Sequence, residues 1–362
     1  MRLYISLIIL IAIISIAGCV AAKPVNRGDY YTYGQMKEAV YELKKQYPEI
    51  VNIHDIGKTN KGRSIFVLEI NPKAEEDEKV GLLAVFAQHA DEHETTKLGM
   101  DFANRLLEGY KQDAAINQYL TEKTVYIIPM ANPDGVDYDL SSEKNFATWR
   151  KNCNSIGEAD GVDLNRNWDY QWDAPVNKKV ESNRTNPKDV SYRGSHPFSE
   201  LETKSISEFI MEHKNIKTFV DYHTGTCNFI QGEILLPFCY TKEQKLSPEA
   251  ADRYNVVSSK MCNLISDAKD TRAPYAAVRA YQMRDYVFRK APLLLKPFVW
   301  FSLPSSTVST GTGIDWAAAH GMMAFGIEIS CRDDFNEKYQ ENHEILVNQQ
   351  YGGFLYLLVG VK

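Results

Sequence analysis

The chain has 362 residues, of which 44% are hydrophobic and 24% are charged. This is enough apolar material for a large buried core, either in one large domain or in two of ordinary size. The 41 basic and 47 acidic residues give a net charge of -6 without a dense Lys/Arg stripe, so a nucleic-acid partner is not expected.

The first nineteen residues differ from the rest of the chain. Met1 and Arg2 precede about 16 mainly apolar residues that end at "IAGC", a pattern that is typical of a secretory signal and short for a membrane span. "IAGC" resembles the lipobox of prokaryotic lipoproteins, which would make Cys19 a lipid-carrying N-terminus. Ordinary cleavage near "AGC" or "VAA" and retention as a membrane anchor are the alternatives. All three place the protein outside the cytoplasm, with membrane attachment only through this N-terminal segment.

The apolar residues that follow predict helices alternating with strands. The first helix is expected in "YGQMKEAVYELKKQYP", where Met36, Val40 and Leu43 recur at helical intervals before Pro48. Short apolar runs predict strands at 64–70, 81–87, 124–130, 217–222 and 323–329. Further helical patterns lie at about 92–109, 198–213 and 247–268, and in "HEILVNQQYGGFLYLL" near the C-terminus. This alternation predicts an α/β fold, with a mixed or largely parallel sheet covered by helices.

Residues 24–362 contain no repeat, low-complexity tract or long linker, so one domain is expected. The polar, Asn-rich region from Lys144 to Tyr192 is expected to form long ordered loops that carry function. Besides Cys19, there are five cysteines, at positions 153, 227, 239, 262 and 331. Their odd number leaves at least one thiol free or paired between chains, and the sequence does not give the pairing. The lack of a CxxC or CxxxC pair argues against a structural zinc cluster.

Candidate metal ligands stand at the ends of two predicted strands, where open sheets bind their ligands. The run 81–87 leads into His89, with Glu92 three positions later, and the run 217–222 leads into His223. Two imidazoles and one carboxylate, with a fourth position open to water, are the ligands of a catalytic zinc. Each signal alone is weak, because such spacings arise by chance and a lone histidine after a strand is more often structural.

Three further segments carry polar residues suited to catalysis. Glu328 interrupts the apolar run "MAFGIEIS", and an acid there is either paired with a base or poised for proton transfer. Arg150 in "WRKN", with Asn165 and Arg166 in "GVDLNRNWD", offers donors suited to carboxylates and developing oxyanions. Taken singly, either arginine reads as a salt bridge in a solvated loop.

Taken in order, these segments resemble the zinc carboxypeptidases of the pancreatic carboxypeptidase A type over about residues 28–360. The resemblance rests on His89-x-x-Glu92, "NPDG", "WRKN", "GVDLNRNWD", "YRG" followed by "FSE", "DYH", "GIDW" and "FGIEI". It implies a mixed, mostly parallel eight-stranded sheet flanked by helices, although fewer than eight strands can be recognised. It also implies an exopeptidase that hydrolyses the C-terminal bond of peptides or proteins with one Zn²⁺ per chain.

The resemblance also assigns roles to individual residues. His89, Glu92 and His223 match the zinc ligands, and Asp163 matches the carboxylate that hydrogen-bonds the first zinc histidine. Glu328 matches the general base that takes a proton from zinc-activated water and returns it to the leaving amine.

Four further positions match the parts of the family site that contact substrate. Arg150 matches the donor that stabilises the oxyanion, and Asn165 and Arg166 match the pair that grips the terminal carboxylate. Ile314 falls near the base of the specificity pocket, where an apolar residue accompanies apolar C-terminal substrates.

Three features depart from the family pattern. Asp91 stands where arginine is usual, so it would repel acidic groups or pair with basic ones, unless it is a helix-start acid that points to solvent. Thr307 stands at the position of the mobile tyrosine, which predicts altered substrate binding with the chemistry intact; Tyr275, Tyr281 or Tyr286 could replace that tyrosine. The segment 273–304 matches poorly and could be core, pocket wall or interface, and no inhibitory pro-domain is expected before the catalytic pattern.

Other functions compete with this interpretation. A related zinc peptidase or amidase could act on cell-wall peptides, although the Asn165–Arg166 pair argues against internal cleavage. A member of the fold that binds peptide without turnover is disfavoured because the ligands, Arg150 and Glu328 occur together. A surface lipoprotein with accidental motifs is disfavoured by the order of the segments. His93 and Glu94 are assigned to the helix, and no oligomeric state is predicted.

Overall fold

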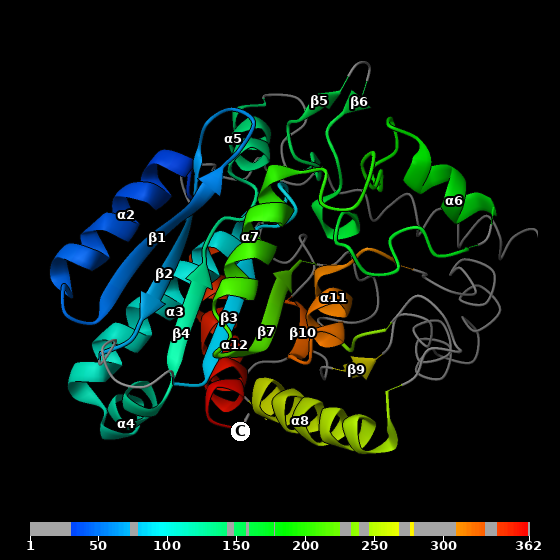
Figure 1. The fold of residues 1–362 in the computed structure, drawn as a ribbon. Helices are drawn as coiled ribbons and strands as arrows, with labels where there is room; N and C mark the ends of the chain where they lie inside the picture. Colours follow the sequence, from blue (N-terminus) through cyan, green and yellow to red (C-terminus); the bar gives the residue numbers. More distant parts are fainter. Residues whose placement is uncertain are drawn as a thin grey trace, which may run out of the picture.

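The computed structural model describes residues 30–72, 79–142, 148–156, 159–176, 178–224, 233–238, 246–267, 276–278, 309–329 and 339–360. Within these ranges one large sheet has eight strands in the order β1-β2-β4-β3-β7-β10-β8-β9 (Figure 1). Its strands are β1 (Val51–Lys58), β2 (Ser64–Ile70), β3 (Gly81–Phe86), β4 (Thr124–Ile128), β7 (Ile216–His223), β8 (Glu233–Leu235), β9 (Ala276–Val278) and β10 (Met323–Glu328). A separate pair comprises β5 (Ser155–Ile156) and β6 (Ala159–Asp160).

The centre of the sheet is parallel and its flanks are mixed. β4, β3, β7 and β10 run parallel to one another, as do β8 and β9. The pairs β1–β2, β2–β4 and β10–β8 are antiparallel. The predicted mixed, mostly parallel eight-stranded sheet is therefore confirmed, and the carboxyl ends of β3, β7 and β10 lie next to one another.

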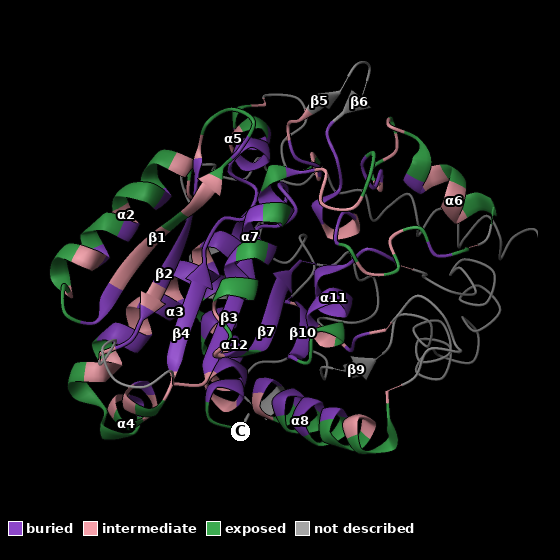
Figure 2. Cartoon of the chain, viewed as in Figure 1, coloured by how far each residue is buried: buried purple, intermediate pink, exposed green. Residues whose placement is uncertain are grey.

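Side chains of the central strands alternate between two apolar cores. From β3, Leu82, Ala84 and Phe86 enter one core, whereas Leu83 and Val85 enter the other. The first core is covered by α2 (Tyr33–Gln46), α3 (His93–Gln112), α4 (Ala114–Glu122), α8 (Pro248–Asp267) and α12 (Tyr339–Gly360). The second is covered by α7 (Leu201–Glu212) and α11 (Gly313–Ala319). Figure 2 shows the resulting buried sheet between layers of helices with exposed outer faces.

Four of the described α-helices were absent from the sequence prediction, namely α4, α5 (Pro133–Ser141), α6 (Lys178–Thr185) and α11, and side-chain capping accounts for α4 and α5. Asp113 accepts hydrogen bonds from the backbone N–H groups of Ala115 and Ile116 and so begins α4. Asn132 caps α5, which has proline at its first position. Side-chain caps and an N-terminal proline are sequence signals for a helix start. The polar region before Tyr192 contains α6 and also η2 (Leu164–Arg166).

Several sequence predictions lie outside the described residues. These are the signal segment with Cys19, the cysteines at 227, 239 and 331, the tyrosines at 275, 281 and 286, Thr307, and the segment 273–304 apart from β9. Cys153 and Cys262 are free thiols. In the described part of the chain, none of the helices has the length and apolar character needed to cross a membrane.

Candidate metal centre and active site

The turn after β3 brings the first two candidate ligands into place. Ala87, directly after the strand, has a positive φ of 50°, and its N–H donates to Thr95 Oγ1 at 2.9 Å. A non-glycine residue in this conformation is uncommon and often lies at a functional turn. His89 follows in the turn, and Glu92 is the residue immediately before α3. His223 is the last residue of the neighbouring strand β7.

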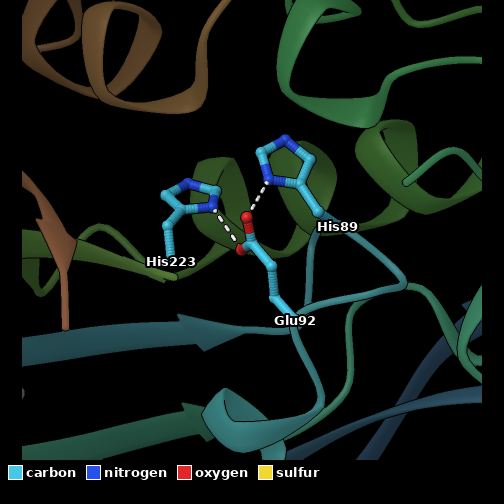
Figure 3. A group of neighbouring side chains, drawn as sticks. All are labelled: His89, Glu92 and His223. Atoms are coloured by element: carbon cyan, nitrogen blue, oxygen red, sulfur yellow. Dashed lines mark hydrogen bonds and ion pairs between the residues drawn. The ribbon is translucent and has the colours of Figure 1, made fainter. Parts of the chain in front are cut away.

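His89, Glu92 and His223 form a buried cluster (Figure 3). The Glu92 carboxylate lies between the two rings, with Oε1 2.9 Å from His89 Nδ1 and Oε2 2.9 Å from His223 Nδ1. One candidate ligand atom from each residue lies within 4.8 Å of the other two. Burial alone would raise the pKa of Glu92, but the positive charges of His89 and His223 outweigh burial and lower it.

The outer nitrogen of each ring faces a buried carboxylate. His89 Nε2 is 3.3 Å from Asp163 Oδ1, an ion-pair contact longer than a well-formed hydrogen bond. His223 Nε2 is 2.7 Å from Asp221 Oδ2. Carboxylates in this position orient metal-binding imidazoles. The cluster therefore fits a catalytic zinc in its ligand types, its burial and its outer partners, and no other described group of His, Cys, Asp or Glu side chains meets the same spacing.

Glu328 lies at the same edge of the sheet. It is the last residue of β10 and stands opposite His223 in the parallel register of β10 and β7. Its Oε2 atom is buried and has no hydrogen-bond partner among the described residues. Burial raises the pKa of this carboxyl, and the charges of His223, His89 and Arg150 only partly offset that effect. Such a group can accept a proton more readily than an exposed glutamate.

A second layer of charge is centred on Asp163. Arg150 Nε donates to Asp163 Oδ2 at 2.9 Å, and the other carboxylate oxygen accepts from the backbone N–H of Asn165 at 3.0 Å. Burial would raise the pKa of Asp163, but Arg150 and Arg166 hold it well below its usual range. Arg166 donates to the Asn165 carbonyl at 2.6 Å. Two arginines and one amide are thus gathered beside the metal cluster.

Ile314 lies in α11 and is buried. A Cβ atom placed on Gly326 of β10 would lie 3.7 Å from Ile314 Cδ1. Ile314 therefore packs in the second apolar core beside Gly326, which precedes Glu328 by two residues on β10.

The remaining polar residues of the first turn divide between the site and the scaffold. Asp91 is only 7% exposed, so the alternative of a solvent-facing acid is wrong. Burial lowers the pKa of Arg150, but the negative charges of Asp163, Glu92 and Asp91 outweigh burial and raise it. His93 Nε2 pairs with Asp139 at 2.6 Å. Glu94 pairs with His343 of α12.

Sequence reasoning missed Asp221. Its signal was its position two residues before His223, which places both side chains on one face of the strand.

Comparison with known proteins agrees with this arrangement. Residues 36–349 match the zinc carboxypeptidase family. The chain is 29% identical over 247 residues to a zinc carboxypeptidase of Saccharothrix mutabilis subsp. capreolus, covering 65% of this chain and 54% of that protein. It is 30% identical over 231 residues to mouse carboxypeptidase A1, covering 63% and 51%. The chain thus spans about half the length of the curated relatives it matches.

Solved structures share the fold. Bovine thrombin-activatable fibrinolysis inhibitor, in complex with tick carboxypeptidase inhibitor, superposes with a TM-score of 0.68 at 19% identity, covering 91% of this chain and 98% of that one. Carboxypeptidase A from Helicoverpa armigera gives 0.65 at 20% identity, covering 93% and 78%. The match over residues 36–349, together with the buried histidine, glutamate and histidine at the strand ends, shows that this chain belongs to the zinc carboxypeptidase family.

Proposed function

We propose that the protein is a zinc-dependent metallocarboxypeptidase that removes single residues from the C-termini of peptides or proteins. The observation that carries the proposal is the buried cluster of His89, Glu92 and His223, which shares a sheet edge with Glu328. His89, Glu92 and His223 would hold one Zn²⁺ per chain. When bound, zinc supplies Lewis acidity toward the scissile carbonyl and the attacking water.

The protein's own residues divide the remaining work. Glu328 accepts the proton of the attacking water and passes it to the leaving amine, a role supported by its burial and by the lack of a described partner for Oε2. Arg150, held by Asp163 at 2.9 Å, directs its remaining N–H donors at the charge that develops on the carbonyl oxygen. Asp163 also faces His89 and so orients that ring.

Asn165 and Arg166 bind the terminal carboxylate of the substrate. Arg166 is half-buried and donates to a backbone carbonyl, so its remaining N–H donors favour a free C-terminus over an internal peptide bond. Ile314 occupies the position that the family resemblance places near the base of the specificity pocket, and its apolar side chain would favour an apolar C-terminal residue. We further propose that the enzyme acts outside the cytoplasm, secreted or held at the cell surface through a lipid on Cys19.

The test is hydrolysis of blocked dipeptides with varied C-terminal residues by the zinc-loaded protein. Release of single residues should depend on zinc, favour apolar C-termini and fail when the C-terminus is amidated. The Glu328→Gln variant should retain zinc but lose turnover. A protein that binds zinc yet cleaves amidated and free substrates equally well would contradict the carboxypeptidase assignment.

A further inference from the structure

A buried chain of polar side chains leads from Trp168 to the candidate ligand His223. Trp168 Nε1 donates to Gln88 Oε1 at 2.8 Å, and Gln88 Nε2 donates to Asp221 Oδ2 at 2.7 Å. The same Asp221 oxygen lies 2.7 Å from His223 Nε2. All four side chains are at most 3% exposed. Gln88 is 80 residues from Trp168 and 133 residues from Asp221 in the sequence, so only the folded protein assembles the chain.

The donors and acceptors of this chain run in one direction. An indole N–H can only donate, so it fixes the amide oxygen of Gln88 toward Trp168 and the amide NH₂ toward Asp221. That NH₂ can also only donate, so Asp221 Oδ2 must accept. A carboxylate oxygen has a second lone pair, which is available to the N–H at His223 Nε2. When His223 serves as a metal ligand, the N–H at Nε2 donates to Asp221 and the Nδ1 lone pair, on the side of Glu92, is left for the metal.

Asn165 cannot take the place of Asp221. Its Nδ2 atom also lies 3.0 Å from His223 Nε2, but its Oδ1 accepts from the Gly313 N–H at 3.1 Å. The amide therefore presents N–H groups to the ring. A protonated Nε2 needs an acceptor, which Asp221 supplies. The Asn165 amide remains available to an anion such as a substrate carboxylate.

We propose that Asp221 is a positioning residue for the metal ligand His223 and that Gln88 and Trp168 orient Asp221. The inference rests on the proposed zinc function. Asp221 is fully buried, and its Oδ1 has no hydrogen-bond partner among the described residues, an arrangement that costs stability. Its position is explained by metal binding, because it selects the tautomer of His223 that can coordinate zinc and fixes the plane of the ring.

The experiment measures zinc affinity by competition with a chromogenic chelator, in the full-length protein and its variants. Asp221→Asn keeps the size of the side chain but removes its charge. Its zinc dissociation constant should rise by about 10-fold to about 100-fold, the range seen when an outer partner of a metal ligand is lost. The visible spectrum of the cobalt-loaded variant should also change, because the plane of His223 is no longer fixed. Gln88→Met, which deprives Asp221 of its donor, should weaken zinc binding in the same direction by less.

Glu69→Gln is the matched control. Glu69 Oε2 accepts from the ring of His54 at 2.8 Å, so it is also a carboxylate paired with an imidazole, but it lies at the opposite end of the sheet. The zinc affinity of the Glu69→Gln variant should equal that of the wild type. A folded Asp221→Asn protein with wild-type zinc affinity and cobalt spectrum would overturn the proposal. If that variant does not fold, unchanged zinc binding by Gln88→Met would overturn it. A wild-type protein that binds no zinc would instead overturn the proposed function.

Discussion

We expect the buried carboxyl group of Glu202 to make the folded protein less stable as the pH rises. This residue lies in the first turn of α7 and is 1% exposed. Its Oε2 is 3.4 Å from Asn152 Nδ2, whereas its Oε1 has no hydrogen-bond partner among the described residues. Burial, aided by the negative charges of Glu200 and Asp134, raises the pKa of Glu202 from 4.5 to about 8.

The sign and size of the effect follow from proton linkage. Between about pH 5 and about pH 8 the folded protein keeps a proton on Glu202 that the unfolded chain has released, so unfolding becomes easier as the pH rises. The stabilisation that comes from this proton is fully present below the pKa that Glu202 has in the unfolded chain. It is lost as the pH rises to the pKa that Glu202 has in the folded protein. Each tenfold change in the acid dissociation constant corresponds to about 1.4 kcal/mol. The loss therefore reaches up to about 5 kcal/mol at about pH 8.

Glu202→Gln should remove this dependence, because an amide of similar shape stays neutral throughout. We expect the variant to match or fall slightly below the wild type near pH 5 and to exceed it by several kcal/mol near pH 8, measured as the free energy of urea unfolding. Glu208→Gln, on an exposed position of the same helix, is the control and should show no such crossover. A constant difference between Glu202→Gln and wild type across this pH range would refute the reasoning.

Three further predictions concern the active site and its support. Arg166→Leu should raise KM for free C-termini and erase the preference over amidated peptides in a paired-substrate assay; retained preference would remove Arg166 from carboxylate recognition. Arg150→Ala should lower kcat by about 100-fold or more while leaving zinc content unchanged by elemental analysis, and a kcat within a few-fold of wild type would exclude it as an oxyanion donor. Gly161→Ala should destabilise the protein by at least about 1–3 kcal/mol, because φ is +77° and the new Cβ would lie 2.0 Å from the Asn152 carbonyl oxygen. An unchanged thermal unfolding midpoint in Gly161→Ala would contradict the positive φ and the close approach at this position.

The sequence predicted the parts of the fold whose residues are uniformly apolar. The inner strands β3, β4 and β10 are buried on both faces and appear as nearly continuous hydrophobic runs. β7 was recognised from the shorter apolar stretch within it, because it also carries Lys217, Thr218 and Asp221. β1 has a mixed burial pattern and reads as polar loop, and β8 and β9 are three residues long. These strands depend on their neighbours rather than on local composition, so periodicity did not reveal them.

The candidate site was predictable where a residue type is rare, and less so where it is common. His89 and His223 attracted attention because each histidine follows an apolar strand. The contact between Asp221 and Gln88 carries no such signal, since polar residues are abundant and these two lie 133 positions apart. Only the sheet register brings these residues together, and no local pattern encodes that contact.

The turn between β3 and α3 also constrains the order of events during folding. Glu92 contacts His223 across 131 residues, and Glu94 pairs with His343 across 249 residues. Closing loops of this length carries an entropic cost before the contacts form. An emerging chain that has reached only α3 contains His89 and Glu92 but neither of these distant partners. The three candidate ligands are therefore present together only after β7 has been made, and a zinc ion that needs all three would bind no earlier than that.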